Sequence, residues 1–268
     1  MISAVILTYN EQNIIHDCLR NLQFVDEILI FDSFSTDNTI EIAKKFNVKV
    51  KYRKFDNYAS QRNEALKHVN QECDWILMID ADEIVTENLK NEILNVIISN
   101  NDISMFRVRR KDMFEGKWLK YSSGYPTWFP RLFKKGHVFV EREINEEYIT
   151  KGKTLNLKNH LIHYPFNKGL HWWFIKHNNY SQMEALVMVQ EVAMPLNISL
   201  LLSADPTKRR KFYKRLSYHL PFRPFIVFIS FYFFKLGFLD GLKGYVFCRM
   251  RMIYESMIQL KFNEIKNK

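Results

Sequence analysis

Short apolar runs and helically spaced apolar positions alternate along the first hundred residues. Four runs predict β-strands, at residues 2–7, 27–31, 48–52 and 75–79. The last run is continuously apolar, which is typical of a strand that is buried on both faces. After each run comes a segment whose apolar residues recur every three or four positions, and this spacing predicts a helix.

Polar residues mark where these helices are expected to begin. Asn10, Asp37 and Thr86 precede the first, second and fourth helices, and the third helix is expected over 57–69. The side-chain oxygens of Asn, Asp and Thr accept hydrogen bonds from the free N–H groups of a first helical turn.

The alternation of strands and helices predicts an α/β fold, with a mostly parallel sheet covered by helices on both faces. In such sheets ligands bind beyond the carboxyl ends of the strands. Asn10, Asp32 and Asp80 each follow a predicted strand. We therefore expect these three residues to direct polar groups into one crevice.

The pattern changes after residue 100. Residues 103–111 alternate like a strand, and residues 112–165 are rich in aromatic side chains, Gly and Pro, with short strand-like pieces. The expected division is one domain over 1–165, with halves at 1–100 and 101–165, followed by a helical extension over 166–268.

Charge is distributed unevenly along the 268 residues. Residues 1–150 carry 20 Lys/Arg and 23 Asp/Glu, a net charge of −3, whereas residues 151–268 carry 19 and 6, a net charge of +13. The acidic front half suits a bound metal ion, and the basic back half suits an anionic surface. A hydrophobic content of 47% is enough to form a core, which excludes a disordered chain.

Cysteine usage and hydropathy indicate the compartment. Cys18, Cys73 and Cys248 form no CxxC pair, which indicates a reducing environment and argues against a disulfide scaffold or a zinc site. No basic region precedes the first apolar run, so no signal peptide is expected. The longest uncharged apolar stretch, 224–234, has about half of the roughly 20 residues that a membrane-spanning helix needs.

Two carboxylates, Asp80 and Asp82, stand one residue apart at the end of the fourth predicted strand. Carboxylates placed so closely repel each other unless a cation lies near them, and hard oxygen ligands suit Mg²⁺ or Mn²⁺. The alternative is a solvated acidic turn in which Glu83 and Glu87 favour the following helix dipole. The position after a buried strand favours the metal site.

Asp32 begins a turn-forming cluster of short polar residues that ends at Asp37. Its carboxylate is a candidate to bind a base or ribose. The alternative is a helix cap and a turn, which Asp and Ser residues commonly form. Because Asp37 lies next to the predicted helix, Asp32 is the residue expected to contact ligand.

Four motifs resemble the family-2 glycosyltransferases, and the similarity is greatest to the bacterial lipopolysaccharide-core branch. They are Ala4-Val5-Ile6-Leu7-Thr8-Tyr9-Asn10-Glu11, Phe31-Asp32-Ser33-Phe34-Ser35-Thr36-Asp37-Asn38-Thr39, Gln61-Arg62-Asn63-Glu64-Ala65-Leu66 and Met78-Ile79-Asp80-Ala81-Asp82-Glu83. Weaker similarity continues through Tyr125-Pro126, Arg131-Leu132-Phe133, His163-Tyr164 and Lys235-Leu236-Gly237-Phe238-Leu239-Asp240-Gly241.

The resemblance implies a GT-A type fold, a nucleotide-diphosphosugar donor, a glycan or glycolipid acceptor, and transfer with inversion. Residues 1–100 would then bind the nucleotide sugar and residues 101–165 would face the acceptor. It further implies a role for six residues around the donor. Thr8, Tyr9 and Glu11 would line the nucleoside pocket, Asp32 would hold the base or ribose, Arg62 would lie near the diphosphate, and Asp80 would contact ribose or metal.

The same resemblance makes Asp82 the direct ligand of Mn²⁺ or Mg²⁺. His163 is a further candidate ligand, although a single His among aromatic residues is more often structural. Inversion needs a general base, for which Glu146 is the candidate, with Glu143 and Glu141 as alternatives. The branch often carries a His-Glu pair where this chain has Asn145-Glu146, and an exposed acidic loop would explain these glutamates equally well.

Two other functions are compatible with parts of the sequence. A sugar-nucleotide pyrophosphorylase shares a related sheet, but it needs a Gly-rich loop after the first strand, where this chain has no glycine. A non-enzymatic basic module that binds lipid or nucleic acid would leave the acidic crevice unexplained. We expect no nucleic-acid partner, and a cytoplasmic enzyme held on the inner membrane by its basic, Phe-rich tail.

Overall fold

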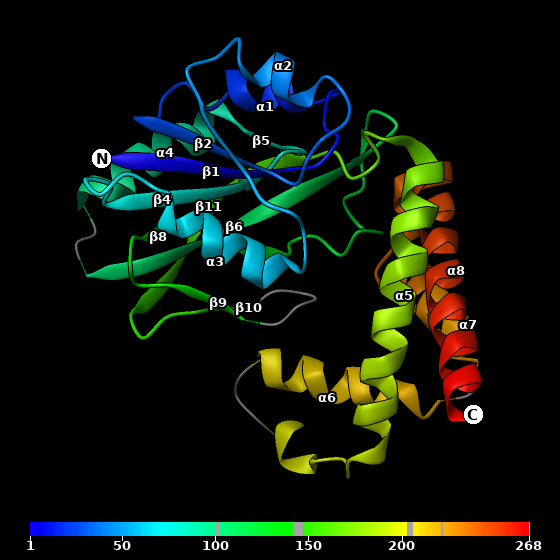
Figure 1. Cartoon of the computed structure of the whole chain (residues 1–268). Helices are drawn as coiled ribbons and strands as arrows, with labels where there is room; N and C mark the ends of the chain where they lie inside the picture. Colours follow the sequence, from blue (N-terminus) through cyan, green and yellow to red (C-terminus); the bar gives the residue numbers. More distant parts are fainter. Residues whose placement is uncertain (100–101, 142–146, 203–205, 221, 268) are drawn as a thin grey trace. The chain divides into compact units, whose positions relative to one another are not determined.

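The computed structural model describes residues 1–99, 102–141, 147–202, 206–220 and 222–267 (Figure 1). These residues form two compact units. The first, which we call the catalytic unit, contains Met1–Trp118 and Tyr125–Lys168, and the second, the helical unit, contains Leu119–Gly124 and Gly169–Lys268. The helical unit therefore includes a six-residue segment from the middle of the chain, which the sequence pattern did not indicate.

Four parallel strands form one half of the main sheet, as predicted. They are β1 (Ile2–Thr8), β2 (Glu27–Asp32), β3 (Lys49–Tyr52) and β4 (Trp75–Asp80). Their order in space is β3-β2-β1-β4. Because β1 lies between β2 and β4, the carboxyl ends of these three strands are adjacent. The predicted α/β class is confirmed.

The other half of the sheet is mixed. Beyond β4 the order continues through β8 (Trp128–Lys134), β6 (Ile103–Phe114), β11 (Lys153–His163) and β5 (Glu83–Val85), and β7 (Lys117–Trp118) pairs with β6. A separate two-stranded sheet contains β9 (Phe139–Glu141) and β10 (Glu147–Ile149). The antiparallel contact of β5 with β11 places His163 opposite Glu83.

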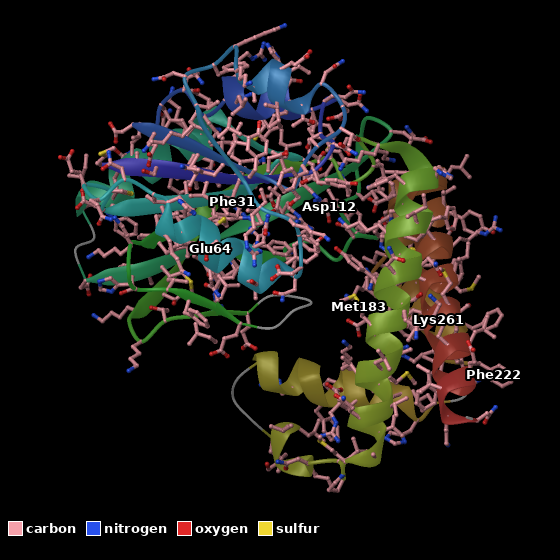
Figure 2. The ribbon with its side chains drawn as sticks, in the orientation of Figure 1. Phe31, Glu64, Asp112, Met183, Phe222 and Lys261 are labelled. Carbon is pink, nitrogen blue, oxygen red and sulfur yellow. The ribbon has the colours of Figure 1, made fainter. Side chains whose placement is uncertain are left out.

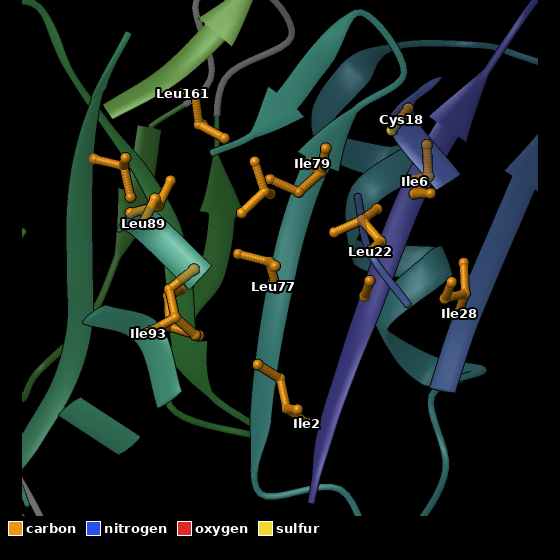
Figure 3. Packing of buried hydrophobic residues seen from close by; sticks show 14 of the residues in the cluster. Ile2, Ile6, Cys18, Leu22, Ile28, Leu77, Ile79, Leu89, Ile93 and Leu161 are labelled. Atoms are coloured by element: carbon orange, nitrogen blue, oxygen red, sulfur yellow. The ribbon is translucent and has the colours of Figure 1, made fainter. Parts of the chain in front are cut away.

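Apolar side chains cover both faces of the parallel strands. On one face, alternate residues of β1 and β4 pack against α1 (Ile15–Arg20) and α4 (Glu87–Ser99), and Figure 3 shows Ile6, Leu22, Leu77 and Ile93 among them. On the other face, Val5 and Met78 pack against Ala65 of α3 (Tyr58–Lys67). The short helix α2 (Thr39–Ala43) follows β2. This double burial holds the strand ends in fixed positions.

The predicted cap at Asn10 is wrong. Helix α1 begins only at Ile15, and Asn10 has a positive φ of 55°. Its side-chain oxygen accepts a hydrogen bond from the backbone N–H of Thr36 at 2.8 Å. Asn10 therefore joins the loop after β1 to the loop after β2, because the left-handed conformation turns its side chain toward that loop. The expected cap Thr86 does accept a backbone hydrogen bond from Leu89, and Asn57, which the sequence placed inside the third helix, caps it by accepting from Ser60.

The helical unit contains two long helices, α5 (Gly169–Ala193) and α8 (Gly241–Lys266), which lie side by side in Figure 1. The chain between them forms a 3-10 turn (Ile198–Leu200), α6 (Pro206–Tyr218), α7 (Arg223–Ile229), a π-helical turn (Ser230–Phe234) and a second 3-10 turn (Gly237–Asp240). Among the described residues no single helix is long and apolar enough to cross a membrane. Within the same residues, one pair of helical segments, Arg223–Phe234 and Gly237–Lys266, meets the criterion when the two are counted together. The angle between these two segments is 72°.

Candidate active site

Loops after β1 and β2 meet at the carboxyl edge of the sheet. Thr8 and Asp32 are register partners in the two strands, and the Thr8 hydroxyl donates to the Asp32 carboxylate at 2.7 Å. Ser35 adds hydrogen bonds from its backbone N–H and its hydroxyl to the same carboxylate, at 2.7 and 2.6 Å. Asp32 is fully buried. Its contacts in this structure organise the two loops, and its contact with a base or ribose stays a prediction.

Asp80 lies at the end of β4, between two arginines. Arg62 of α3 donates to one carboxylate oxygen at 2.7 Å, and Arg131 of β8 donates to the other at 2.6 Å. Burial opposes the charged form of Asp80, but Arg131 and then Arg62 outweigh it and hold the pKa of this carboxyl well below its usual range. Asp80 is therefore an ionised, rigidly held carboxylate.

Arg131 and Glu83 are site residues that sequence reasoning did not assign. Arg131 is buried and also donates to Glu83 at 2.8 Å, and Glu83 is fully buried. Arg110 of β6 reaches the same Glu83 oxygen at 3.3 Å. Glu83 was considered only as part of a helix first turn, whereas it lies in β5 and connects two arginines. In the sequence, the available signal for Arg131 was its place inside the apolar run of β8. A charged residue in such a run is expected to be buried, and a charge is rarely buried without a partner.

His163 connects two further carboxylates. Its Nε2 lies 3.3 Å from Asp82 Oδ2, and its Nδ1 lies 2.7 Å from Asp112 Oδ1. Figure 2 labels Asp112, near the end of β6. Burial and Arg110 disfavour the imidazolium, but Asp82 and Asp112 outweigh them and raise the pKa of His163. The structure thus brings His163 to Asp82, although 81 residues separate them in the sequence.

Glu11, which is one of the residues predicted to line a nucleoside pocket, is held by the segment after β11. Lys168 Nζ lies 2.6 Å from one Glu11 oxygen and 2.7 Å from the Tyr9 carbonyl, and the Asn167 amide donates to the other Glu11 oxygen at 2.9 Å. Burial is the main cause that raises the pKa of Glu11, and the neighbouring Asp82 adds to it. Tyr9 itself is exposed. The loop that carries Tyr9 and Glu11 and the Asp82 segment are therefore neighbours.

Only one of the three candidate bases lies in the described part of the chain. Glu141 ends β9 and is exposed. Asn63 of α3 fixes this strand, since its side chain accepts from the Val140 N–H at 3.0 Å and donates to the Val140 carbonyl at 2.7 Å. Glu143 and Glu146 lie outside the described residues.

Aromatic residues near β7 and β8 form a group with basic side chains. The rings of Trp118 and Tyr125 meet edge to face at 5.0 Å, and the Arg109 guanidinium lies over Tyr125 and Trp128 at 5.9 and 5.7 Å. Tyr121, which lies between Trp118 and Tyr125 in the sequence, belongs to the helical unit.

A comparison with known protein families decides between the functions considered above. The sequence profile of glycosyl transferase family 2 matches residues 3–152. The chain belongs to glycosyl transferase family 2. This match covers all of the strands and loops that carry Thr8, Asp32, Asp80 and Asp82, and it confirms the predicted α/β fold of GT-A type. Family membership therefore favours a glycosyltransferase over the two alternatives, a sugar-nucleotide pyrophosphorylase and a non-enzymatic basic module.

The family-2 chain is similar to several curated relatives. It is 25% identical over 269 residues to the lipopolysaccharide core biosynthesis glycosyltransferase LpsC of Rhizobium meliloti, covering 97% of this chain and 91% of that protein. It is 39% identical over 102 residues to an uncharacterized glycosyltransferase of Rickettsia felis, covering 37% of this chain and 35% of the relative. It is also 36% identical over 99 residues to glycosyltransferase SunS of Bacillus subtilis, covering 35% and 23%.

Solved structures of glycosyltransferases also resemble this one. S. aureus TarS 1–349 in complex with UDP-GlcNAc matches with a TM-score of 0.46 and 16% identity, over 99% of this chain and 91% of TarS. Glucosyl-3-phosphoglycerate synthase from Mycobacterium tuberculosis, with Mn²⁺ and UDP, matches with a TM-score of 0.36 and 20% identity, over 42% and 44% of the two chains.

Proposed function

We propose that this family-2 member is a metal-dependent, inverting hexosyl-type glycosyltransferase that moves a sugar from a nucleotide-diphosphosugar to a glycan or glycolipid. The observation that carries the proposal is the position of Asp82. Its carboxylate ends the loop after the buried strand β4, next to His163 and near Glu11. The carboxylate of Asp82 is a suitable ligand for a hard cation, and the neighbouring loop that carries Glu11 is the one that the family resemblance assigns to nucleoside binding.

The side chains of Asp82 and His163 fit a divalent cation. Two donors bound to one ion at about 2.1 Å, at right angles, lie about 3 Å apart. The separation of Asp82 Oδ2 and His163 Nε2, 3.3 Å, is close to this value. Asp112 holds the other nitrogen of the ring, which is how carboxylates orient metal-binding imidazoles.

The remaining coordination positions would be open to substrate. In the described parts of the chain, no three His, Cys, Asp or Glu side chains form a group that could hold a metal ion. Mg²⁺ and similar ions commonly take one or two protein ligands together with phosphate oxygens. When bound, the ion would neutralise the charge that develops on the departing nucleoside diphosphate.

Asp80 has a different role in this proposal. Arg62 and Arg131 engage both of its oxygens, which leaves Asp82 and His163 as the better-placed metal ligands. Asp80 would contact the ribose, and Arg62 would lie beside the diphosphate. Thr8, Tyr9, Glu11 and Asp32 would form the nucleoside pocket, because their loops are linked to one another and to the segment Asn167–Lys168.

Inversion requires a base that removes the proton of the acceptor hydroxyl on the side opposite the leaving group. We assign this role to Glu146, with Glu143 and Glu141 as alternatives. The nearby strand β9 is held against α3 by Asn63, so the chain that leads to these glutamates starts from a fixed position.

The similarity to LpsC along 97% of the chain favours a place in lipopolysaccharide core or other cell-surface polysaccharide synthesis. We infer a cytoplasmic enzyme that is bound to the inner face of the membrane, since the +10 net charge of the protein resides in the helical unit. That unit has 16 Lys/Arg against 6 Asp/Glu, whereas the catalytic unit has 23 of each.

A panel of nucleotide sugars tests the proposed function. Donor binding to the native state raises the unfolding temperature. We expect one nucleotide sugar to raise it in the presence of Mn²⁺ or Mg²⁺, and a much smaller rise in EDTA. If no nucleotide sugar produces a shift with either ion, the proposed donor class is wrong.

A further inference from the structure

The helical unit exposes several large apolar side chains on α7 and around the bend that leads into α8. Six large side chains define it, and we call them the apolar corner: Phe225, Ile229, Phe233, Phe234, Leu239 and Leu242. The first three are spaced four residues apart and therefore share one side of the helical segment. Phe234 and Leu242 are 82% and 77% exposed, so they pack against almost nothing.

The inner side of the bend is filled by other residues. Phe228 and Tyr232 stack on each other, and each ring meets Tyr245 of α8 edge to face. Gly244 lies so close to Gly237 that a Cβ atom at Gly244 would stand 2.3 Å from the Gly237 carbonyl oxygen. The bend is therefore tightly packed within, and the outward apolar side chains are not needed to hold it together.

The chain segment that carries most of the corner contains basic residues and no exposed carboxylate. Between Phe222 and Arg251 the sequence has one acidic residue, Asp240, and it is buried. Its carboxylate accepts hydrogen bonds from the backbone N–H groups of Lys120, Tyr121 and Ser122, at 3.2, 3.0 and 2.7 Å. The exposed charges of this region, such as Lys235 and Arg249, are consequently positive.

We propose that the apolar corner inserts into the headgroup region of an anionic phospholipid bilayer. The inference rests on the membrane partner proposed above and identifies the residues that enter the lipid. Neither arm of the bent pair can cross a bilayer by itself, whereas an apolar face bordered by lysine and arginine suits shallow insertion along the interface. The basic residues would then meet lipid phosphates.

The charges argue against a second copy of the chain as the occupant. In a two-fold symmetric contact the same patch meets itself, so the basic border of one corner would face that of the other. No exposed carboxylate between Phe222 and Arg251 is available to neutralise them. An anionic lipid surface supplies that neutralisation.

The corner is also joined to the chain segment that follows β7. Asp240, which lies between Leu239 and Leu242, binds the segment Leu119–Gly124. This segment leaves the catalytic unit after Trp118 and returns to it at Tyr125. Asp240 thus ties the corner to a segment from the middle of the chain that belongs to the helical unit.

Vesicle binding by the full-length chain tests the proposal. All three native cysteines are buried, so Leu242→Cys provides an accessible thiol for an environment-sensitive fluorophore. We expect its emission to increase and shift to the blue with vesicles that contain phosphatidylglycerol. A label at Ile98→Cys, a site in the catalytic unit that is 78% exposed, should not respond. In co-sedimentation, the double variant Phe234→Asp/Leu242→Asp should bind these vesicles at least tenfold more weakly than the wild type, whereas Ile98→Asp should bind like the wild type.

The outcomes separate this inference from the proposals on which it rests. Equal vesicle binding by the wild type and the Phe234→Asp/Leu242→Asp variant would refute insertion of the apolar corner. Membrane association by another part of the protein would then remain. Absence of wild-type binding to every vesicle would overturn both, without affecting donor binding in the nucleotide-sugar panel. A dimeric wild type that the double variant converts to a monomer, with no fluorophore response to vesicles, would identify a second copy as the occupant.

Discussion

At the scale of single residues, the candidate site is a connected series of charges rather than an isolated pair of aspartates. Arg131 is central to it, because it bonds Asp80 and the fully buried Glu83. Burial disfavours the charge on Arg131, but the two carboxylates outweigh this effect and raise its pKa further. The arginines and His163 pair with the carboxylates of four acidic residues, Asp80, Asp82, Glu83 and Asp112. This pairing explains how these carboxylates can lie close together before any metal ion is bound.

Removal of Arg131 should therefore destabilise the protein. Arg131→Met leaves the Glu83 carboxylate buried with only Arg110 as a cationic partner, and breaking a buried ion pair typically costs about 3–5 kcal/mol. We expect a loss of this size in the free energy of unfolding, measured by urea denaturation. The control is Lys67→Met, which removes an exposed partner of Glu64 and should leave the midpoint unchanged. An unaltered midpoint for Arg131→Met would refute the role of this arginine.

The base can be identified from kinetics. A group that acts only in the transition state affects kcat much more than it affects donor binding. We expect Glu146→Gln to lower kcat by roughly 10²–10⁴-fold, the range typical of general-base removal, with donor affinity unchanged. Glu143→Gln and Glu141→Gln, the latter at the exposed end of β9, test the two alternatives in the same way. If Glu143→Gln shows this profile and Glu146→Gln does not, the base is Glu143.

At the scale of elements, the parallel half of the sheet followed from sequence because each signal was local. The apolar runs, the cap at Thr86 and the polar residues after β1, β2 and β4 are all separated by a few positions. The mixed half depends on distant pairings. The strand β5 has only three residues and is stabilised by β11, about 80 positions later, so no local pattern predicts it.

The same reason limited the prediction of the site. Asp80 and Asp82 were found from a local motif, whereas Arg131, Arg110 and Asp112 enter through strands of the mixed half. His163 was recognised only as a candidate. Its contact with Asp82 depends on the pairing of β5 with β11, which the sequence did not reveal.

Packing between α5 and α8 should depend on pH through His177. Its ring stacks on Trp173 at 3.7 Å and meets Tyr254 of α8 edge to face at 4.9 Å. Burial, with smaller contributions from Lys176 and Arg251, lowers the pKa of His177 to about 4, although its bond to the Trp173 carbonyl opposes the shift. The unfolded chain, with a His pKa near 6.5, binds the proton more readily, so stability falls as the pH drops from 6.5 toward 4.

This lowered pKa corresponds to a loss of about 2 kcal/mol between pH 7 and pH 5. We expect His177→Gln to remove that part of the pH dependence of unfolding, as followed by the circular dichroism of the full-length chain. His171→Gln, at an exposed position of the same helix, should retain it. A pH dependence that His177→Gln leaves intact would show that this histidine does not link α5 to α8.

At the scale of the whole molecule, chemistry and charge are divided between the two units. The predicted donor and metal residues that the structure describes all belong to the catalytic unit, whereas the net positive charge and the apolar corner belong to the helical unit. This division agrees with a match to the family-2 profile that ends at residue 152, before the helical extension.

The most direct test of the central claim is Mn²⁺ binding in the presence of the donor nucleotide. For the wild type we predict one bound ion per chain, measured by electron paramagnetic resonance of free Mn²⁺. Asp82→Asn should abolish binding while the protein stays folded, and Asp112→Asn should weaken it by roughly 10–100-fold through the loss of ring orientation. Asp17→Asn, on the exposed side of α1, should bind like the wild type. Unchanged Mn²⁺ binding by Asp82→Asn, or full donor binding in EDTA, would contradict the account.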